Sequence, residues 1–314
     1  MLSIMKKCAV FSCLGLGDGL ITLVLSHNLS LNGYAVTTYH PFLNQMQSWF
    51  PSLPIIPFPE TALEMTLASF DRFFIMYERS ERMQAILTYC QTHYKEKTTV
   101  LNPIATAKTN YPYWEQGRFD GRVPFVENLY QFCRGVLKLS VVTKNNGIVI
   151  PEGLLSRKHK ERVIIHPTSS RPGKNWSQKK FLALGKKLER KGLKPIFILT
   201  DAEKKEWAQV NTLGSADLSS LAAYVYESGH MIGNDSGIGH LASCFGLPTV
   251  TICRNKQASA FWRPSWSPAE VITPASWVPN LKGLRLRDQY WKQWISVRRV
   301  FSVFLSQLKK QLPH

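Results

Sequence analysis

The sequence predicts an α/β protein built from two doubly wound, Rossmann-like domains that face each other across an interdomain cleft. Its 314 residues are about twice the usual length of a single domain. Strand-like and helix-like segments alternate in two separate blocks, and turns of small residues follow several of the strands. We expect a first domain over residues 1–150, a second over 151–287 and a C-terminal helix over 288–314.

The first block begins with an apolar segment at residues 5–13, which predicts a buried strand. A glycine-rich turn follows at 15–19, and residues 20–31 predict a helix that stops before Gly33. Residues 34–39 predict the next strand and complete a strand–helix–strand unit of a parallel sheet. Further along we expect a proline-rich loop at 51–59, a strand at 71–77 and a helix at 126–139. The first domain is therefore predicted to be Rossmann-like.

The second block repeats this alternation after a polar linker at residues 143–160. Glycines stop two of its expected helices, at Gly192 and Gly246. The expected elements are the strand 162–166, the helix 178–191, the strand 195–200, the helix 218–228, the strand 230–233, the helix 238–245 and the strand 248–253. A second parallel sheet follows, with ligands expected beyond the carboxyl ends of its strands.

Positive charge is concentrated in the second block. Residues 1–150 carry 13 Lys+Arg against 10 Asp+Glu, whereas residues 151–314 carry 26 against 11, in a chain of net charge +18. A phosphorylated ligand, an anionic membrane, a nucleic acid and a merely solvated surface all fit this charge. Because no helix-turn-helix, zinc-finger or RNP-type pattern occurs, we expect an anionic ligand on the second domain and no nucleic-acid partner.

We expect a cytoplasmic protein without a signal peptide or a membrane-spanning helix. Asp18 and three glycines interrupt the N-terminal apolar run, and no stretch of about 18 apolar residues occurs. The six cysteines, at positions 8, 13, 90, 133, 244 and 253, form no C-x-x-C pair and no zinc-type cluster with histidine. This pattern predicts reduced, mostly buried thiols and no metal site.

The strongest chemical signal is the run GNDSGIGHLA at residues 233–242, followed by GLPTV. A strand ends here, a turn of small residues exposes backbone N–H groups, and a helix begins, which is the geometry that binds phosphate. We expect Asp235, Ser236 and Gly237 to meet a diphosphate, with His240 one turn further along. As alternatives, Ser236 is the N-cap of an ordinary helix and His240 is a core histidine.

A second motif, HPTSSRPGKNWS at residues 166–177, follows the first strand of the same domain. Ser169 and Ser170 supply two hydroxyls and Lys174 a positive charge, which together suit a pyrophosphate leaving group. Both motifs follow the carboxyl ends of strands, so we expect them to form one site. The alternative for Lys174 is an ordinary surface lysine.

The third motif is the turn GLGDG at residues 15–19. It is no dinucleotide-binding fingerprint, because it lacks a third glycine at the proper spacing. Its acid, Asp18, lies inside the turn, where a carboxylate can take a proton from a hydroxyl. The alternative is that Asp18 caps its helix.

In this order, the three motifs resemble those of glycosyltransferase family 9, the ADP-heptose:lipopolysaccharide heptosyltransferases, over about residues 5–270. The resemblance implies the GT-B architecture and an inverting, metal-independent transfer without a cofactor. The donor would be a nucleotide-sugar, ADP-heptose, and the acceptor a lipopolysaccharide core or another glycolipid or saccharide. Asp18 would be the general base that deprotonates the acceptor hydroxyl.

The resemblance also assigns donor-binding residues. Lys174 and the turn of Asp235, Ser236 and Gly237 match the family's diphosphate site. The remaining matches are Ser169 and Ser170 to a hydroxyl pair, His240 to the motif histidine and Glu203 to an acid near the nucleotide ribose.

Two positions depart from the family pattern. Val24 stands where the family usually has Pro, and Arg254 stands where it usually has Gly after the Pro-Thr-Val strand. The second departure is close to the donor site, so a UDP- or GDP-sugar is the alternative donor. On the acceptor side, Arg118 and Arg122 are the best candidate cations, with a solvated loop as the alternative.

The C-terminal segment interleaves aromatic and basic residues and predicts a helix over about 288–311. Such a helix can lie on an anionic membrane, here the cytoplasmic face of the inner membrane. Alternatively it packs back on the first domain, as the last helix of GT-B enzymes does. A non-catalytic basic protein that binds nucleic acid or a membrane is the functional alternative to a transferase.

Overall fold

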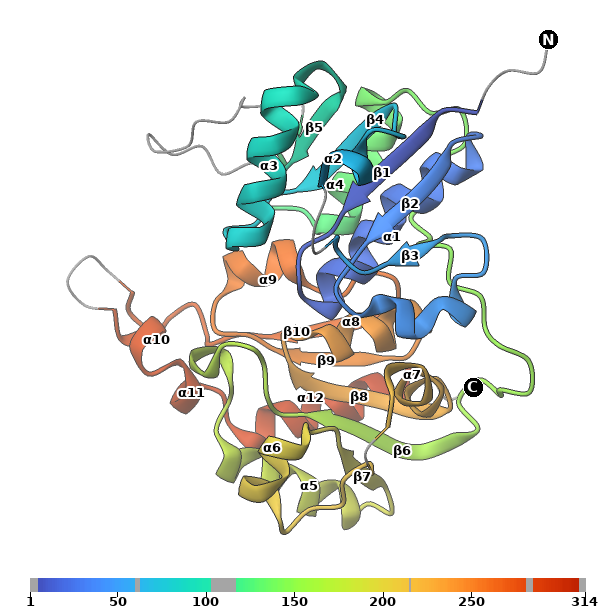
Figure 1. Ribbon diagram of the computed structural model, residues 1–314. Coiled ribbons are helices and arrows are strands. Elements are labelled where there is room, and N and C mark those ends of the chain that lie inside the picture. Colours follow the sequence, from blue (N-terminus) through green and yellow to red (C-terminus); the bar gives the residue numbers. More distant parts are fainter. Residues whose placement is uncertain (1–4, 60–62, 103–116, 215, 281–284, 311–314) are drawn as a thin grey trace. The chain divides into compact units, whose positions relative to one another are not determined.

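The computed structural model describes residues 5–59, 63–102, 117–214, 216–280 and 285–310 (Figure 1). Its contacts divide the chain into two compact units, Met1–Pro151 and Glu152–His314. Each unit contains a five-stranded parallel sheet with helices packed on it, which confirms the predicted α/β class with two Rossmann-like sheets. No helix in the described ranges is long and apolar enough to cross a membrane.

The first sheet has the strand order β3-β2-β1-β4-β5. Its strands are β1 (Lys7–Phe11), β2 (Ala35–Tyr39), β3 (Ile55–Ile56), β4 (Arg72–Met76) and β5 (Thr98–Leu101). Its helices are α1 (Leu16–Leu31), α2 (Leu63–Leu67), α3 (Glu81–His93) and α4 (Phe125–Gln131), with a π-helical turn at Phe132–Val136 and 3₁₀ segments at Leu43–Trp49 and Lys95–Lys97. β3 lies in the proline-rich segment that was expected to be a loop, because Ile55 pairs with Thr38 of β2.

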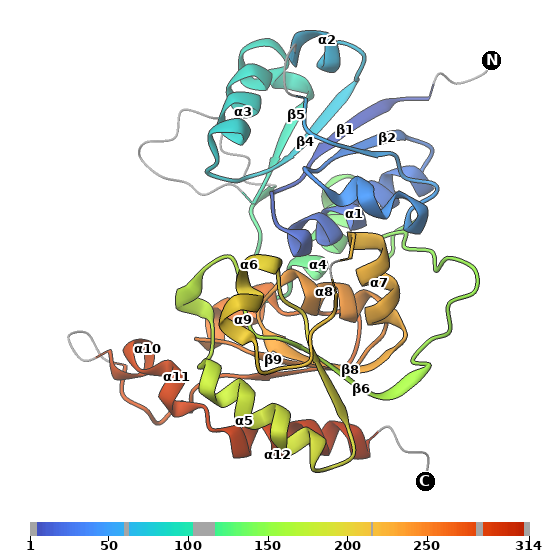
Figure 2. The same ribbon diagram turned by 60° about the horizontal axis from the view of Figure 1, so that its bottom comes forward.

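After its exposed first residue, the central strand β1 has buried side chains on both faces of the first sheet. Ala9 and Phe11 of β1 belong to a core with residues of α2 and α3, including Leu67 and Ile86. Side chains alternate along a strand, so the buried Val10 between them points to the opposite face. Figure 2 shows α2 and α3 on one side of this sheet and α1 and α4 on the other.

The second sheet has the order β10-β9-β8-β6-β7. Its strands are β6 (His159–His166), β7 (Lys194–Phe197), β8 (Ser228–Asn234), β9 (Thr249–Ile252) and β10 (Ala269–Ile272). Its helices are α5 (Gln178–Glu189), α6 (Asp201–Lys204), α7 (Leu218–Tyr226), α8 (Gly237–Cys244), α9 (Lys256–Trp262), α10 (Leu286–Gln289), α11 (Trp291–Trp294) and α12 (Val297–Lys309), with 3₁₀ turns at Pro172–Lys174 and Lys205–Trp207. The helices α5 and α12 cover one face of this sheet, and α7 and α8 cover the other (Figure 2).

The C-terminal segment differs from the single helix that was expected. It forms α10, α11 and α12, and the chain is extended at Ile295 before Ser296 caps α12 by accepting the N–H of Arg299 at 3.2 Å. Val300 and Phe304 of α12 are buried in the core of the second unit with residues of α5. This helix therefore packs on the second domain, in place of the expected return to the first. Residues 311–314 of the predicted helical segment lie outside the described ranges.

Gly229 of β8 leaves no room for a side chain, because a Cβ there would collide with the backbone oxygen of Lys160 on β6. We expect Gly229→Ala to lower the free energy of unfolding by about 1–3 kcal/mol through this overpacking. Urea denaturation measures the change as a lower midpoint. The control is Gly214→Ala, where a Cβ would meet no described atom within 4 Å. Equal midpoints for the two variants would contradict the close approach of the strands.

Candidate active site

The strand orders locate the ligand-binding edge of each sheet. In open α/β sheets, ligands bind beyond the carboxyl ends of the strands, where the strand order reverses. That point lies between β1 and β4 in the first sheet and between β6 and β8 in the second. The segments that begin directly after these four strands contain Asp18, Glu78, Lys174 and Asp235 respectively.

Asn234, the last residue of β8, joins the two loops of the second sheet. Its side chain is buried. Its Oδ1 accepts the backbone N–H of Trp176 at 3.0 Å, and its Nδ2 donates to the carbonyl of Pro167 at 2.5 Å. Both partners lie in the loop after β6, so Asn234 fixes that loop against the turn that begins at Asp235. This residue was not predicted from the sequence, although a polar residue at the end of a fully buried strand was the available signal.

Lys174 and Asp235 meet in a pocket of about 250 Å³. The Lys174 Nζ lies 3.1 Å from the Asp235 Oδ2, with 40% of the lysine side chain exposed and 14% of the aspartate side chain. The described residues that line the pocket are Arg171, Gly173, Lys174, Asp235, Ile252, Cys253, Arg254 and Asn255. Three cations thus surround one carboxylate, and the excess positive charge favours an anionic ligand. Arg171 was not singled out from the sequence.

The N-terminus of α8 begins directly beyond Asp235. Ser236 is the N-cap residue, its backbone is extended, and its side chain caps no N–H of the helix. Among the described residues, its buried Oγ has no hydrogen-bond partner. A buried hydroxyl without a partner is costly, and the first N–H groups of a helix attract anions. The turn therefore offers a hydroxyl and backbone donors to a ligand.

His240 is buried inside α8 rather than on the pocket wall. Its ring packs edge-on against Trp266, with ring centroids 6.3 Å apart. Burial lowers the pKa of His240, although the charge of Asp235 opposes this effect. The ring is thus part of the packed interior around α8, which is the alternative stated for it from the sequence.

The other predicted donor residues do not line this pocket; Ser169 and Glu203 form hydrogen bonds within their own segments. The Ser169 hydroxyl donates to the Asn175 Oδ1 at 2.7 Å, and Ser170 is exposed. Glu203 lies in the first turn of α6, where its carboxylate accepts both the N–H and the hydroxyl of Thr200 at 2.8 Å. Burial would raise the pKa of Glu203, but hydrogen bonds from Thr200 and Thr168 lower it overall. None of Ser169, Ser170 and Glu203 is among the described residues that line the pocket.

Asp18 lies in the first turn of α1, after the N-cap residue Gly15. A Cβ at Gly15 would collide with the Asp18 Oδ2, so the carboxylate lies back over the turn and requires glycine there. The N-terminus of a helix favours the ionised form of such a carboxylate.

Glu78 brings a second carboxylate to this turn from the loop after β4. Its Oε2 accepts the backbone N–H of Leu14 at 2.9 Å. Burial raises the pKa of Glu78. Glu78 was not predicted from the sequence, although an acid soon after a buried strand could have suggested it.

His40 contacts the backbone of the turn that carries Asp18. Its Nδ1 accepts the N–H of Leu43 at 3.0 Å and that of Phe42 at 3.3 Å, and its Nε2 lies 3.2 Å from the carbonyl oxygen of Gly15. These contacts fit a neutral ring that is protonated on Nε2 alone. Burial lowers the pKa of His40 to about 4 from 6.5. Protonation of Nδ1 would break both backbone hydrogen bonds.

We expect this burial to make stability depend on pH. Between pH 6.5 and about 4 the unfolded His40 binds more protons than the folded one, so its contribution is complete above pH 6.5 and is lost on acidification towards pH 4. The loss amounts to about 3 kcal/mol. Urea denaturation across this pH range should show a shallower decline for His40→Gln than for the wild type. His93→Gln, at an exposed position, should follow the wild type. Parallel pH profiles for all three proteins would contradict this role.

The two candidate acceptor-side cations lie in one loop of the first unit. The Arg122 Nη2 pairs with the Asp120 Oδ2 at 2.8 Å, and hydrogen bonds from Arg122 lower the pKa of Asp120 to about 2. Arg118 is exposed. The charge of Arg122 is therefore shared with Asp120, which leaves Arg118 as the stronger candidate.

Comparisons with known proteins concern the family and the fold. Residues 143–282 match the model of glycosyltransferase family 9 (heptosyltransferase). Among solved structures, E. coli ADP-heptose lipopolysaccharide heptosyltransferase II is 15% identical, with a TM-score of 0.65 over 98% of this chain and 99% of that one. A family 9 glycosyltransferase from Veillonella parvula DSM 2008 is 15% identical, with a TM-score of 0.68 over 99% of both chains.

A third solved structure is E. coli heptosyltransferase WaaC with ADP-2-deoxy-2-fluoro heptose. It is 13% identical, with a TM-score of 0.65 over 96% of this chain and 99% of that one. A search of the curated proteins found no match.

At such low identity the solved structures show the fold alone, which is a GT-B-like fold with two five-stranded parallel sheets. The match over residues 143–282 agrees with the predicted family, glycosyltransferase family 9, for this part of the chain. Within the described ranges, no group of three or more His, Cys, Asp or Glu is placed to hold a metal ion.

Proposed function

We propose that this enzyme transfers a heptose or a related sugar from an ADP-sugar to a lipopolysaccharide core or another surface-glycan acceptor. Transfer proceeds with inversion at the anomeric carbon and without a metal. The observation that carries this proposal is the pocket in which Lys174 and Asp235 meet, beside the N-terminus of α8. The second domain thus holds the nucleotide-sugar, and the first, residues 1–150, holds the acceptor.

Donor binding follows from the charges of the pocket. Lys174 and the N–H groups at the start of α8 bind the diphosphate and stabilise its charge as it leaves, with Ser236 as a hydroxyl donor. The carboxylate of Asp235 repels phosphate, so its role is to orient Lys174 and to accept hydrogen bonds from sugar hydroxyls. An ADP donor is supported by WaaC, which was solved with an ADP-heptose analogue. TibC from E. coli H10407 was likewise solved with ADP-D-β-D-heptose.

Asp18 is the general base of the proposed reaction. Its carboxylate accepts the proton of the acceptor hydroxyl as that oxygen forms a bond to the anomeric carbon and the bond to the diphosphate breaks. Glu78 and His40 position the turn that carries Asp18 through their bonds to Leu14 and Gly15. Arg118, with Arg122, offers positive charge to an acidic acceptor.

We assign the enzyme to the cytoplasm, with peripheral contact to the inner membrane. The six cysteines are free thiols, as a reducing compartment allows. Trp291 and Phe304, two aromatic residues of the C-terminal segment, are buried in the core. We propose that the exposed basic side chains of α12 contact the membrane, together with Trp294, which is 39% exposed.

Calorimetric titration with ADP, UDP and GDP, without metal, tests the donor site. We expect ADP to bind most tightly, and Lys174→Ala to weaken ADP binding about tenfold to hundredfold through loss of a charge-assisted hydrogen bond. Lys179→Ala, an exposed lysine on α5, is the matched control and should bind ADP as the wild type does. Asp235→Asn should keep ADP binding and weaken the extra affinity that the sugar contributes.

Two outcomes would change the proposal. Preferential binding of UDP or GDP would mean that the donor sugar is carried by uridine or guanosine diphosphate and not by ADP. If no nucleotide binds, the donor-site assignment is wrong. The positive charge of the second domain would then serve to bind a membrane or a nucleic acid.

A further inference from the structure

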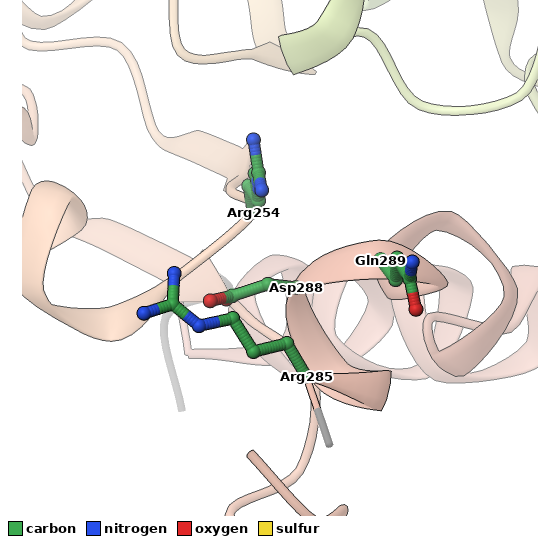
Figure 3. Close-up of a pocket in the computed structure, with 4 residues that line it drawn as sticks. All are labelled: Arg254, Arg285, Asp288 and Gln289. Atoms are coloured by element: carbon green, nitrogen blue, oxygen red, sulfur yellow. The ribbon is translucent and has the colours of Figure 1, made fainter. Parts of the chain in front are cut away.

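A second pocket, of about 350 Å³, shares Arg254 with the donor pocket. Its described lining residues are Arg254, Arg285, Asp288 and Gln289. In Figure 3, Arg285 and Asp288 reach in the same direction from the segment of α10, and Arg254 projects from the chain after β9. The volume falls in the range of about 300–1,000 Å³ that is usual for small-ligand sites.

The two guanidinium groups of this pocket share it with one carboxylate, that of Asp288. Neither Arg254 nor Arg285 forms an ion pair or a side-chain hydrogen bond within the described part of the chain, whereas the carboxylate of Asp288 accepts from the Asn280 Nδ2 at 3.1 Å. Two like charges that face one pocket repel each other, and a bound anion relieves the repulsion. Guanidinium groups bind carboxylate and phosphate through paired N–H donors.

The wall that carries Arg285 is held in place before any ligand binds. Arg287, on α10, donates to the carbonyl of Val278 at 2.6 and 2.9 Å and to that of Ser276 at 2.5 Å. The backbone N–H of Asp288 donates to the Asn280 Oδ1 at 3.3 Å. These bonds tie α10 to residues 276–280, so the pocket needs little ordering when it binds.

We propose that Arg254 and Arg285 bind the carboxylate or phosphate of an acidic sugar unit, and that Asp288 and Gln289 bind its hydroxyls. Asp288 accepts hydrogen bonds, and the Gln289 amide both accepts and donates them. A sugar acid or a sugar phosphate fits this mixture of charges better than a free inorganic anion, because the carboxylate of Asp288 would repel the latter. The proposal rests on the proposed function in one respect, namely that the adjoining pocket holds the diphosphate of the donor.

Arg254 gives this chain a specificity of its own. It stands where the resembling family usually has Gly, and it lines both the donor pocket and the second pocket. An arginine there adds a positive charge next to the sugar of the donor. The acidic unit then belongs either to the transferred sugar or to the acceptor, and both present the same chemistry to Arg254 and Arg285.

Two calorimetric comparisons test the pocket and separate these sources. The first uses ADP-glucose and ADP-glucuronic acid, which differ only at C6. The second uses methyl glucoside, methyl glucuronide and glucose 6-phosphate, titrated into the protein with and without saturating ADP. We expect the acidic member of at least one set to bind about tenfold to hundredfold more tightly than its neutral counterpart. A preference in the first set assigns the acidic unit to the donor, and one in the second alone assigns it to the acceptor.

The variants Arg285→Gln and Arg254→Gly should each abolish the acidic preference. Arg190→Gln, at an exposed position at the end of α5, is the matched control and should retain it. Arg285 is absent from the described lining of the donor pocket, so Arg285→Gln should bind ADP like the wild type. Equal binding of acidic and neutral ligands, or a preference that survives in Arg285→Gln, would overturn the proposal. If no nucleotide binds, the proposed function fails, and the saccharide series without ADP still decides this inference.

Discussion

Replacing Asp18 with asparagine is expected to lower kcat about 10²–10⁴-fold, because the amide cannot accept the proton of the acceptor hydroxyl. The side chain keeps its size, so the turn beside Gly15 should keep its shape. Donor affinity should stay within about twofold, since only interactions with the acceptor proton are removed. The measurement is the rate of ADP release from ADP-heptose with a deacylated lipopolysaccharide core as acceptor.

Glu78→Gln is the control for this result. The amide oxygen of glutamine can still accept the N–H of Leu14, so the turn keeps its support and the loss of rate should be much smaller. Activity of Asp18→Asn within tenfold of the wild type would remove Asp18 from the role of base. A larger loss in Glu78→Gln than in Asp18→Asn would transfer that role to Glu78.

The replacement of Asn234 with alanine has the largest expected effect on the second domain. It leaves the N–H of Trp176 and the carbonyl of Pro167 without their buried partner. Each such group costs about 1–3 kcal/mol, so the free energy of unfolding should fall by about 2–6 kcal/mol. Because the same two bonds fix the loop that carries Lys174, ADP binding should weaken as well. Urea denaturation and ADP titration measure the two effects.

The control for this variant is Asn145→Ala. Asn145 is exposed, and its Oδ1 accepts the N–H of Gly147 at 2.7 Å. Its loss should lower the free energy of unfolding by no more than about 1 kcal/mol, since water replaces the lost partner. If Asn234→Ala is as stable as Asn145→Ala and binds ADP normally, Asn234 does not hold the two loops together.

Elements with a strong local pattern were predictable from the sequence. The helix that ends before Gly33 was expected to begin at residue 20 and begins at Leu16. The turn before α8 lies where the small residues of the DSG motif placed it. In contrast, β3 spans only Ile55 and Ile56 and exists because β2 pairs with it, which no local pattern reports. The C-terminal helix was misplaced because its amphipathic pattern identifies an apolar face and not the surface that this face meets.

The candidate site divides in the same way. Lys174 and Asp235 were expected to share a site, because both follow strands of one parallel sheet, and their side chains lie 3.1 Å apart. The roles of Asn234 and His40 were not predictable, since each depends on backbone groups that are remote in the chain. Asn234 reaches a carbonyl 67 residues away, and His40 reaches one 25 residues away.

By itself, the sequence determined the class of fold and the two loops that hold Lys174 and Asp235, because apolar periodicity and glycine-rich turns are local properties of the chain. The tertiary structure decided which strands become neighbours, and therefore which loops meet. It alone brought Arg254 and Arg285 to one pocket, from positions 31 residues apart that no periodic pattern connects. Charges act over a few ångströms of space, and only the folded chain sets those distances.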